Sequence, residues 1–239
     1  MVTLVLVHGA GDTAAVWNTV QHELSVPSLA LDLPGRGKNP YDLSRVTVDL
    51  AVRRAVADIV ELTSGPVVLV AHSMGGALSP GILAQLGDRI VHLVHIAAVA
   101  ADEGELPLAT ASLEFVAQLL ADADGLRTAL HGATLADGTG PLPFGLRSTD
   151  DRGALARIDS LNLGCVPTSW AGAPAAIPRT YIRPLRDRLY PPDAQERLAV
   201  AMQADEVISL DVGHNVARTA PGGLAGVLGE IAGRYEGGR

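Results

Sequence analysis

Short apolar segments recur along the chain, and segments with a helical spacing of apolar residues separate most of them. Strands are predicted at residues 2–7, 27–31, 67–72, 90–97, 179–183 and 206–210. The first and third of these segments are apolar at nearly every position, which is typical of strands buried on both faces. Helices are predicted after the first strand, at 47–62, after residue 73, at 191–204 and at 221–235. This alternation predicts an α/β fold with a parallel sheet and helices on both of its faces.

Local signals refine three of the predicted helices. The helix at 47–62 gathers its apolar residues on one face, namely Val48, Val52, Ala55, Val56, Ile59 and Val60. Either Asp12 or Thr13 can cap the helix after the first strand. In the helix after residue 73, the ring of Pro80 would clash with the carbonyl of Gly76, so we expect a kink or an early break there.

Residues 100–178 interrupt this regular alternation. Helical patterns are visible at 114–121 and 150–161, and residues 132–145 between them are rich in Gly and Pro. Because a compact α/β core does not need this segment, we expect a core of residues 1–99 and 179–239 and an inserted cap at residues 100–178. The alternative is a mobile surface loop.

Charge and composition exclude several classes of protein. The chain has 239 residues, which fits one α/β domain, and its net charge of −8 without a basic cluster argues against nucleic-acid binding. No apolar run reaches the roughly 18 residues that a membrane span needs, and the N-terminus lacks the basic region of a signal peptide. The lone Cys165 suits a reducing compartment, so we expect a cytoplasmic protein. The oligomeric state is not indicated.

The segment from Val67 to Gly76 carries the clearest chemical signal. An apolar strand stops at Ser73, two glycines follow, and a helical pattern begins. This strand–turn–helix pattern resembles the G-x-S-x-G nucleophile elbow, in which a serine hydroxyl projects above the sheet. Ala71 replaces the first glycine, which adds only one methyl group. The alternative is an ordinary glycine-rich turn of an α/β protein.

A serine nucleophile needs a base, and the base needs an acid that orients it. Polar groups follow the predicted strands at five places, namely the turn of residues 8–11, Ser73, Asp102, Asp187 and His214. We expect His214 to be the base and Asp187 the acid, because both directly follow the last predicted strands. Asp102 is the alternative candidate for the acid, because it follows the strand predicted after Ser73. Asp187 could instead pair with Arg186 or Arg188, and His214 could simply cap a helix.

The other histidines are weaker candidates for the base. His72 is expected to point away from Ser73, and His8 to support the turn that follows the first strand. His92 and His95 are three residues apart in a strand, so they should point to opposite faces, and no metal site is expected from them.

An oxyanion intermediate needs two backbone N–H groups. The N–H of Met74 directly follows the nucleophile, and the second should come from the turn after the first strand, most simply from Ala10. Gly9 and Gly11 allow that backbone to approach closely.

These motifs together resemble the α/β-hydrolase fold family. The matching segments are residues 8–11 with Trp17, 32–35, 71–76, 186–187 with 191–192, and 213–214. The resemblance covers residues 2–98 and 179–235. The given sequence starts directly at the first predicted strand, without the two preceding strands of longer members. In this it is similar to the branch of plant methylesterases, small bacterial esterases and hydroxynitrile lyases. It implies about six parallel strands under a small helical cap. Lyase members carry Thr after the first-strand His and Lys after the catalytic His, where this chain has Gly9 and Asn215.

The resulting prediction is a serine hydrolase of small carboxylic esters that uses no metal and no organic cofactor. Thioester hydrolysis or a cyclase or lyase step could use the same residues, and a non-catalytic ligand-binding protein is the third alternative. Gly9, Phe144 and Trp170 are candidate substrate contacts. The aromatic residues could equally form the core of the cap itself.

Overall fold

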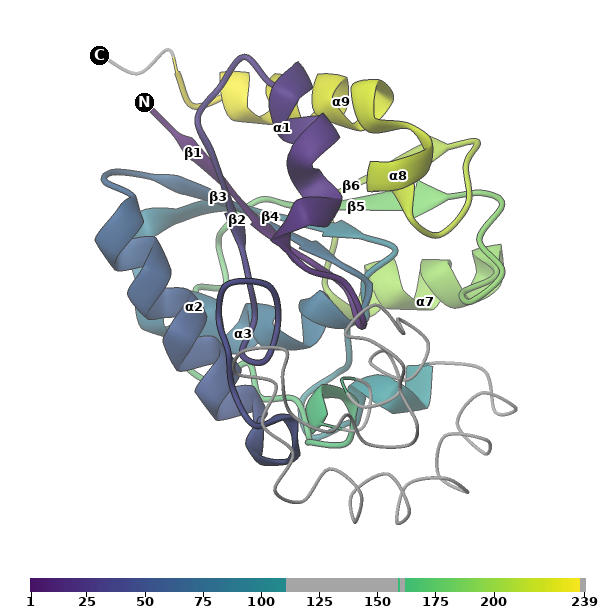
Figure 1. The fold of residues 1–239 in the computed structure, drawn as a ribbon. Helices are drawn as coiled ribbons and strands as arrows, with labels where there is room; N and C mark the ends of the chain where they lie inside the picture. Colours follow the sequence, from purple (N-terminus) through teal and green to yellow (C-terminus); the bar gives the residue numbers. More distant parts are fainter. Residues whose placement is uncertain (111–158, 160–161, 237–239) are drawn as a thin grey trace, which may run out of the picture.

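The computed structural model describes residues 1–110, 159 and 162–236, and its strands form one six-stranded sheet (Figure 1). The strands are β1 (Thr3–Val7), β2 (Ser28–Leu31), β3 (Val67–His72), β4 (Ile90–Ile96), β5 (Arg179–Pro184) and β6 (Glu206–Leu210). Their order is β2-β1-β3-β4-β5-β6, and every neighbouring pair is parallel. The predicted parallel sheet of about six strands is therefore confirmed.

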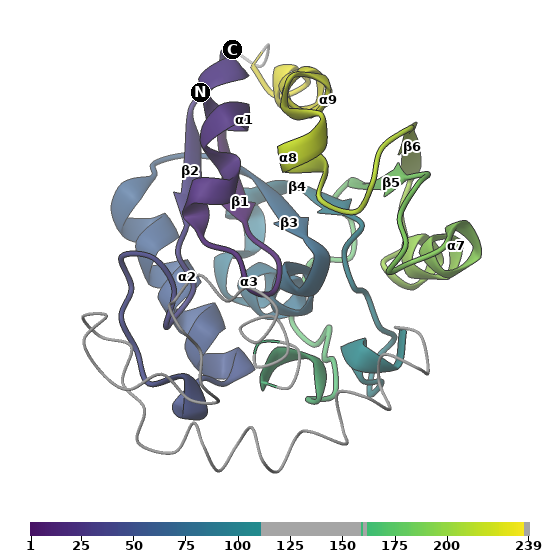
Figure 2. The same cartoon turned by 45° about the vertical axis from the view of Figure 1, so that its right-hand side comes forward.

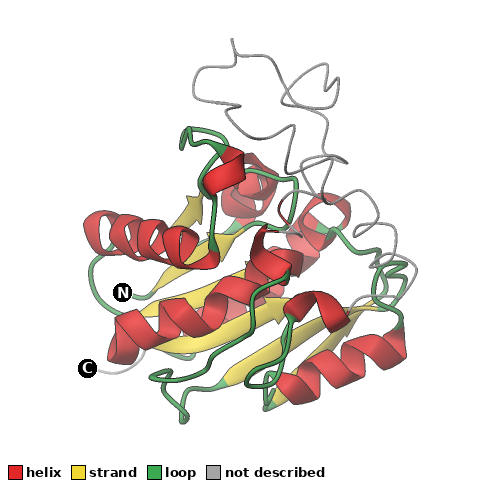
Figure 3. Ribbon diagram, turned by 90° about the horizontal axis from the view of Figure 1, so that it is seen from below, coloured by secondary structure: helices red, strands yellow, loops and turns green. Residues whose placement is uncertain are grey.

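Helices cover both faces of this sheet (Figure 3). The α-helices are α1 (Asn18–Glu23), α2 (Val48–Leu62), α3 (Ser79–Leu86), α7 (Pro192–Ala201), α8 (Val216–Thr219) and α9 (Pro221–Gly233). Short 3₁₀ helices are η1 (Ala14–Trp17), η2 (Leu43–Arg45), η3 (Ser73–Leu78), η4 (Gly87–Arg89) and η5 (Pro107–Thr110). Helices α1, α8 and α9 lie together on one face, whereas α2, α3 and α7 lie on the other (Figures 1 and 2).

Successive residues of the central strands feed two separate cores. Leu4 and Leu6 of β1 pack on the side of α1 and α9, whereas Val5 and Val7 pack on the side of α2 and α3. All four side chains are fully buried. Burial of one such aliphatic side chain contributes about 1.5–3 kcal/mol, so the apolar runs of the sequence fix this sheet between two layers.

The proline in the helix after Ser73 coincides with a change of helix type. Residues 73–78 form the 3₁₀ helix η3, and the α-helix begins only at Ser79. Pro80 thus occupies the first turn of α3, where its missing N–H leaves no hydrogen bond unmade. The expected clash with the Gly76 carbonyl is thus avoided, because the α-helix begins at Ser79 and does not run through Pro80 from Ser73.

The structure also tests two other local expectations, which concern the cap of η1 and the apolar face of α2. Thr13, rather than Asp12, caps η1 by accepting a hydrogen bond from the Ala15 N–H at 3.3 Å. Val60, which shares the predicted apolar face of α2, lies at its margin and is 56% exposed. It lies about 100° around the helix from the fully buried Ile59, which carries it past the edge of the packed face.

The described parts of the predicted cap begin directly after β4. Gly104 and Glu105 exchange backbone hydrogen bonds with Thr168 at 2.9 and 2.8 Å, which holds residues 100–110 against residues 162–178. Most of residues 100–178, including Phe144 and both predicted helices apart from Asp159, lies outside the described residues. No helix of the described ranges is both long and apolar enough to cross a membrane.

Candidate active site

Ser73, His214 and Asp187 meet at the carboxyl ends of β3, β6 and β5. The Ser73 Oγ lies 2.9 Å from the His214 Nε2, and the His214 Nδ1 lies 2.7 Å from the Asp187 Oδ2. Since a carboxylate only accepts, the His214 Nδ1 carries the proton in the neutral ring, and the Nε2 lone pair faces the serine hydroxyl. The three residues that the sequence singled out are therefore joined in one hydrogen-bonded chain.

The Asp187 carboxylate is held on both of its oxygen atoms. While Oδ2 bonds His214, Oδ1 accepts the backbone N–H groups of Leu189 and Tyr190 at 2.7 and 3.1 Å. The side chain is fully buried, and the Tyr190 ring packs 5.8 Å from the His214 ring. Arg186 pairs with Asp211 instead. This arrangement fixes one orientation of the imidazole.

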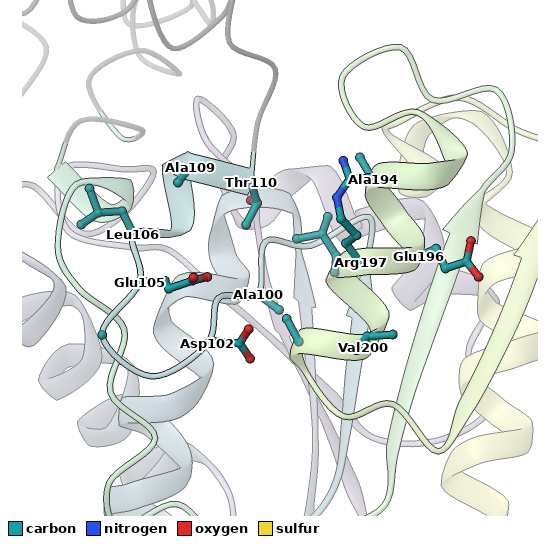
Figure 4. Close-up of a pocket in the computed structure, with 13 residues that line it drawn as sticks. Ala100, Asp102, Glu105, Leu106, Ala109, Thr110, Ala194, Glu196, Arg197 and Val200 are labelled. Atoms are coloured by element: carbon teal, nitrogen blue, oxygen red, sulfur yellow. The ribbon is translucent and has the colours of Figure 1, made fainter.

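Asp102, the rival acid, lies elsewhere. Its exposed side chain lines a cavity of about 920 Å³ between residues 100–110 and α7 (Figure 4). Arg197 and Glu105 line the same cavity, but none of the three residues of the hydrogen-bonded chain does. The structure therefore brings Asp187, and not Asp102, to the histidine.

The backbone around Ser73 has the geometry of a sharp elbow. Ser73 has a φ of 52°, a left-handed conformation that non-glycine residues rarely adopt. A Cβ on Gly75 would lie 2.7 Å from the His8 carbonyl oxygen, and one on Gly76 would lie 2.3 Å from that of Val99. Both glycines are thus required for the helix to pass this close to the strands. Ala71, in contrast, has no positive φ and is buried in β3 without strain.

His72 has a contact that sequence reasoning missed. Its Nε2 donates to the His214 carbonyl oxygen at 3.1 Å, and the two rings lie 5.0 Å apart. Burial, and secondarily the neighbouring His214, lowers the pKa of His72 to about 3. His72 is therefore neutral at ordinary pH and supports the loop that carries His214.

His8 orients the turn after β1. Its Nδ1 donates to the Gly9 carbonyl oxygen at 2.8 Å, and its Nε2 accepts the Leu33 N–H at 3.3 Å. Burial lowers the pKa of His8, so the ring stays neutral. The Gly9 carbonyl belongs to the same peptide plane as the Ala10 N–H and points the opposite way. His8 therefore directs the Ala10 N–H away from itself, and this N–H has no hydrogen-bond partner among the described residues.

The second expected oxyanion donor is the Met74 N–H. Met74 is the second residue of η3, where backbone N–H groups lack partners within the helix. Gly9 lies directly against Ser73, because a Cβ on Gly9 would be 2.9 Å from both the Ser73 Cβ and the His72 Nδ1. The turn after β1 and the elbow after β3 are thus in van der Waals contact.

A further polar cluster ties this turn to the histidine loop. The Asp12 carboxylate accepts hydrogen bonds from the Asn215 Nδ2 at 3.1 Å and from the Arg218 Nη2 at 2.5 Å. Asn215 follows His214 directly, at the position where the lyases named in the sequence resemblance carry Lys. Its amide is engaged by Asp12, so this position supplies no cation to the site.

Trp170 lies away from Ser73. Its indole N–H donates to the Ala101 carbonyl oxygen at 2.9 Å, and its ring stacks on the Arg179 guanidinium at 5.0 Å. Arg179 begins β5, so this contact is at the opposite end of the strand from Asp187. We therefore do not propose Trp170 as a substrate contact. Phe144, the other aromatic candidate, lies outside the described residues.

Known proteins resemble this chain in sequence and in fold. The chain is 33% identical over 92 residues to lipase LipV of Mycobacterium tuberculosis, which is 38% of this chain and 35% of that protein. The matches to curated relatives span only 28–40% of those relatives' own lengths. An extracellular α/β-hydrolase from a Paenibacillus species has the same fold, with a TM-score of 0.75, 21% identity and coverage of 96% of this chain and 98% of that one.

A plant methylesterase, MES16 from Arabidopsis, also shares the fold. Its TM-score is 0.66, with 22% identity over 98% of this chain and 100% of that one. At these identities the two structural likenesses speak for the fold alone. The model of the alpha/beta hydrolase family matches residues 4–227, which is nearly the whole chain. This protein therefore belongs to the alpha/beta hydrolase family.

Proposed function

We propose that this protein is a serine hydrolase of small carboxylic esters that works through an acyl-enzyme intermediate. The observation that carries the proposal is the continuous chain of hydrogen bonds from Ser73 through His214 to Asp187, at 2.9 and 2.7 Å. A serine hydroxyl is a weak nucleophile at neutral pH, and a base at hydrogen-bond distance activates it. The elbow presents that hydroxyl at the sheet edge where substrates of such folds bind.

The first half-reaction forms the acyl-enzyme. The Ser73 Oγ attacks the ester carbonyl carbon while His214 Nε2 takes its proton, and Asp187 stabilises the resulting imidazolium. The carbonyl oxygen becomes an oxyanion between the N–H groups of Ala10 and Met74. When the intermediate collapses, the C–O bond to the alcohol breaks, and His214 returns its proton to the leaving alkoxide.

The second half-reaction releases the acid. His214 removes a proton from a water molecule, whose oxygen attacks the acyl carbon within the same pair of oxyanion donors. Collapse of this second intermediate breaks the bond to the Ser73 Oγ, which recovers its proton from His214. Apart from the ester and this water molecule, the steps use only side chains and amides of this chain.

The other reactions considered for this site have less support. The engaged amide of Asn215 gives no counter-ion for a cyanide leaving group, which disfavours lyase chemistry. No contact among the described residues favours a thioester over an ester. A binding protein without turnover would not need the complete chain of hydrogen bonds to Ser73.

The direct test replaces the nucleophile. Ser73→Ala should lower kcat/KM for p-nitrophenyl esters by at least about 10³-fold, because the remaining members of a triad cannot act without the nucleophile. Ser79→Ala is the matched control, since Ser79 is also a buried serine bonded to a histidine, His95, at 2.9 Å. The control should keep activity within about threefold. Ester turnover by Ser73→Ala within about tenfold of the parent protein would contradict the proposal.

A further inference from the structure

A carboxylate from the cap region is bonded directly to the turn after β1. The Asp159 Oδ2 accepts the Gly11 N–H at 2.8 Å, although the two residues are 148 positions apart in the chain. The other oxygen, Oδ1, accepts the Arg36 Nη2 at 2.5 Å. The side chains of Asp159 and Arg36 are only 8% and 2% exposed. The buried Asp159–Arg36 ion pair is therefore bonded directly to the turn that carries the proposed oxyanion donor.

The bonded N–H belongs to the central peptide of a tight turn. The Asp12 N–H closes the turn on the Gly9 carbonyl at 3.3 Å, and Gly11 has a φ of 73°. A positive φ at the third residue is the requirement of a type II turn. Rotation of the central peptide would convert this turn into another type and would point the Ala10 carbonyl at Asp159. Repulsion between that carbonyl and the carboxylate opposes the rotation.

Ala10 is consequently restrained on both sides. His8 holds the Gly9–Ala10 peptide through the Gly9 carbonyl, and Asp159 holds the Ala10–Gly11 peptide through the Gly11 N–H. The oxyanion donor proposed above is the N–H between these two restraints. A donor that is aimed before the reaction stabilises the oxyanion without reorganisation in the transition state.

The charge on Asp159 strengthens this restraint. A hydrogen bond to an ionised acceptor is roughly twice as strong as one between neutral groups. Arg36 compensates the buried charge, and its own backbone N–H is bonded to the Leu33 carbonyl in the loop after β2. The Leu33 N–H in turn donates to His8, so hydrogen bonds through Leu33 connect Arg36 to His8. The ion pair and the histidine that hold the turn are therefore linked to each other.

We propose that Asp159 is a positioning residue that fixes the turn of residues 9–12 so that the Ala10 N–H points at the developing oxyanion. The inference rests on the proposed serine hydrolase function and adds a residue that acts through the backbone without contacting substrate. It also makes the cap region a part of the oxyanion machinery, in addition to any part it has in substrate binding.

The test compares three single variants with p-nitrophenyl esters and with a trifluoromethyl ketone, which forms an anionic adduct with an activated serine. Asp159→Ala removes the acceptor, whereas Asp159→Asn keeps an acceptor oxygen without the charge. Asn162→Ala is the matched control, because the Asn162 Nδ2 fastens the same segment to the Leu43 carbonyl at 2.8 Å, away from the turn.

We expect Asp159→Ala to lower kcat by about 10- to 100-fold with KM within about threefold, less than the loss from deleting an oxyanion donor outright. The affinity for the trifluoromethyl ketone should fall by a similar factor, because the same N–H holds its oxyanion. Asp159→Asn should recover part of both losses, and Asn162→Ala should leave both within about twofold. Equal effects of Asp159→Ala and Asn162→Ala on kcat and on ketone affinity would overturn the positioning role.

Loss of Asp159 alone removes a counter-charge from the buried Arg36, which can prevent folding. The double variant Arg36→Met with Asp159→Ala removes both charges and should show the same drop in kcat as Asp159→Ala. A double variant with parental kcat would overturn the proposal. The proposed function has its own separate readout: ester turnover that survives in Ser73→Ala refutes both, whereas an inactive Ser73→Ala beside unaffected Asp159 variants refutes the positioning alone.

Discussion

Contacts of the surrounding backbone hold Ser73 in a strained, left-handed conformation. A left-handed conformation costs a non-glycine residue about 1–2 kcal/mol. The Ser73 carbonyl accepts the Val99 N–H at 3.1 Å. In addition, Gly75 packs closely against the His8 carbonyl and Gly76 against the Val99 carbonyl. The strain is compensated by this packing and leaves the Oγ within hydrogen-bond distance of His214. Small residues at this elbow therefore matter for where the hydroxyl points.

Gly9 is the position where one added methyl group should disturb the site most directly. In Gly9→Ala the Cβ would lie 2.9 Å from the Ser73 Cβ, so the turn after β1 must move away from the elbow. Because donor and nucleophile geometry change together, we expect kcat/KM to fall by about 10- to 100-fold while the far-ultraviolet circular dichroism is unchanged.

Gly226→Ala serves as the control for this change. Gly226 lies within α9, and a Cβ there meets no atom within 4 Å. The substitution should leave kcat/KM unaltered and raise stability by up to about 1 kcal/mol, since alanine favours the helix. Equal activity of the two variants would show that the contact between Gly9 and Ser73 is unimportant.

At the scale of elements, the strand ends bring the candidate residues together. Parallel strands β1, β3, β5 and β6 bring the turn of residues 9–12, Ser73, Asp187 and His214 to one edge of the sheet. The order of these residues along the chain is enough to predict this, because the carboxyl ends of parallel strands share an edge. That is why the sequence predicted the hydrogen-bonded chain of side chains residue by residue.

The supporting contacts escaped sequence reasoning for a physical reason. His72, Asp12 and Asp159 each act through a partner that is more than 140 residues away in the chain. Local periodicity and turn signals report only on neighbouring residues, so they cannot show such pairs. The short helix α8 was missed for a related reason, since four residues carry too little periodicity to be recognised.

Asp12 connects two of these elements, the turn after β1 and helix α8. Asp12→Ala removes the acceptor for Asn215 and Arg218 and frees the loop that carries His214. We expect a lower Tm and a kcat reduced by roughly tenfold, because the base is then held less firmly. Steady-state kinetics and thermal unfolding measure both effects.

An exposed ion pair provides the comparison for Asp12→Ala. Asp193 and Arg197 form an i,i+4 pair on α7 with both side chains 72% exposed, whereas the Asp12 side chain is 10% exposed. Asp193→Ala should leave kcat and Tm unchanged, since exposed pairs contribute little. If the two variants behave alike, Asp12 has no special part in joining the two loops.

At the scale of the whole molecule, buried histidines should make the fold sensitive to acid. Burial lowers the pKa of His72 and of His95 to about 3, and it also lowers the pKa of His8. In the unfolded chain these groups titrate near 6.5, so below that pH the unfolded state binds more protons than the folded state. Stability is therefore fully present above pH 6.5 and is lost progressively as the pH falls towards 3.

His95 isolates this effect from the active site. It is fully buried and bonded to Ser79, on the face of the sheet opposite His92, as its place in the strand predicted. Between pH 6 and pH 4, His95→Gln should reduce the slope of the unfolding free energy by about one proton, or about 1.4 kcal/mol per pH unit. Urea unfolding at several pH values measures this slope. A slope identical to that of the parent protein would contradict the assignment.

The proposed function makes Ser73 the covalent nucleophile of an ester hydrolase. The most direct measurement is peptide mapping by mass spectrometry after reaction with an aryl phosphonate ester, which is attacked by activated serines and leaves a stable adduct. We predict one phosphonate group, on the peptide that contains Ser73, and none after Ser73→Ala. Ester turnover by the parent protein together with an unlabelled Ser73, or with the adduct on another residue, would contradict it.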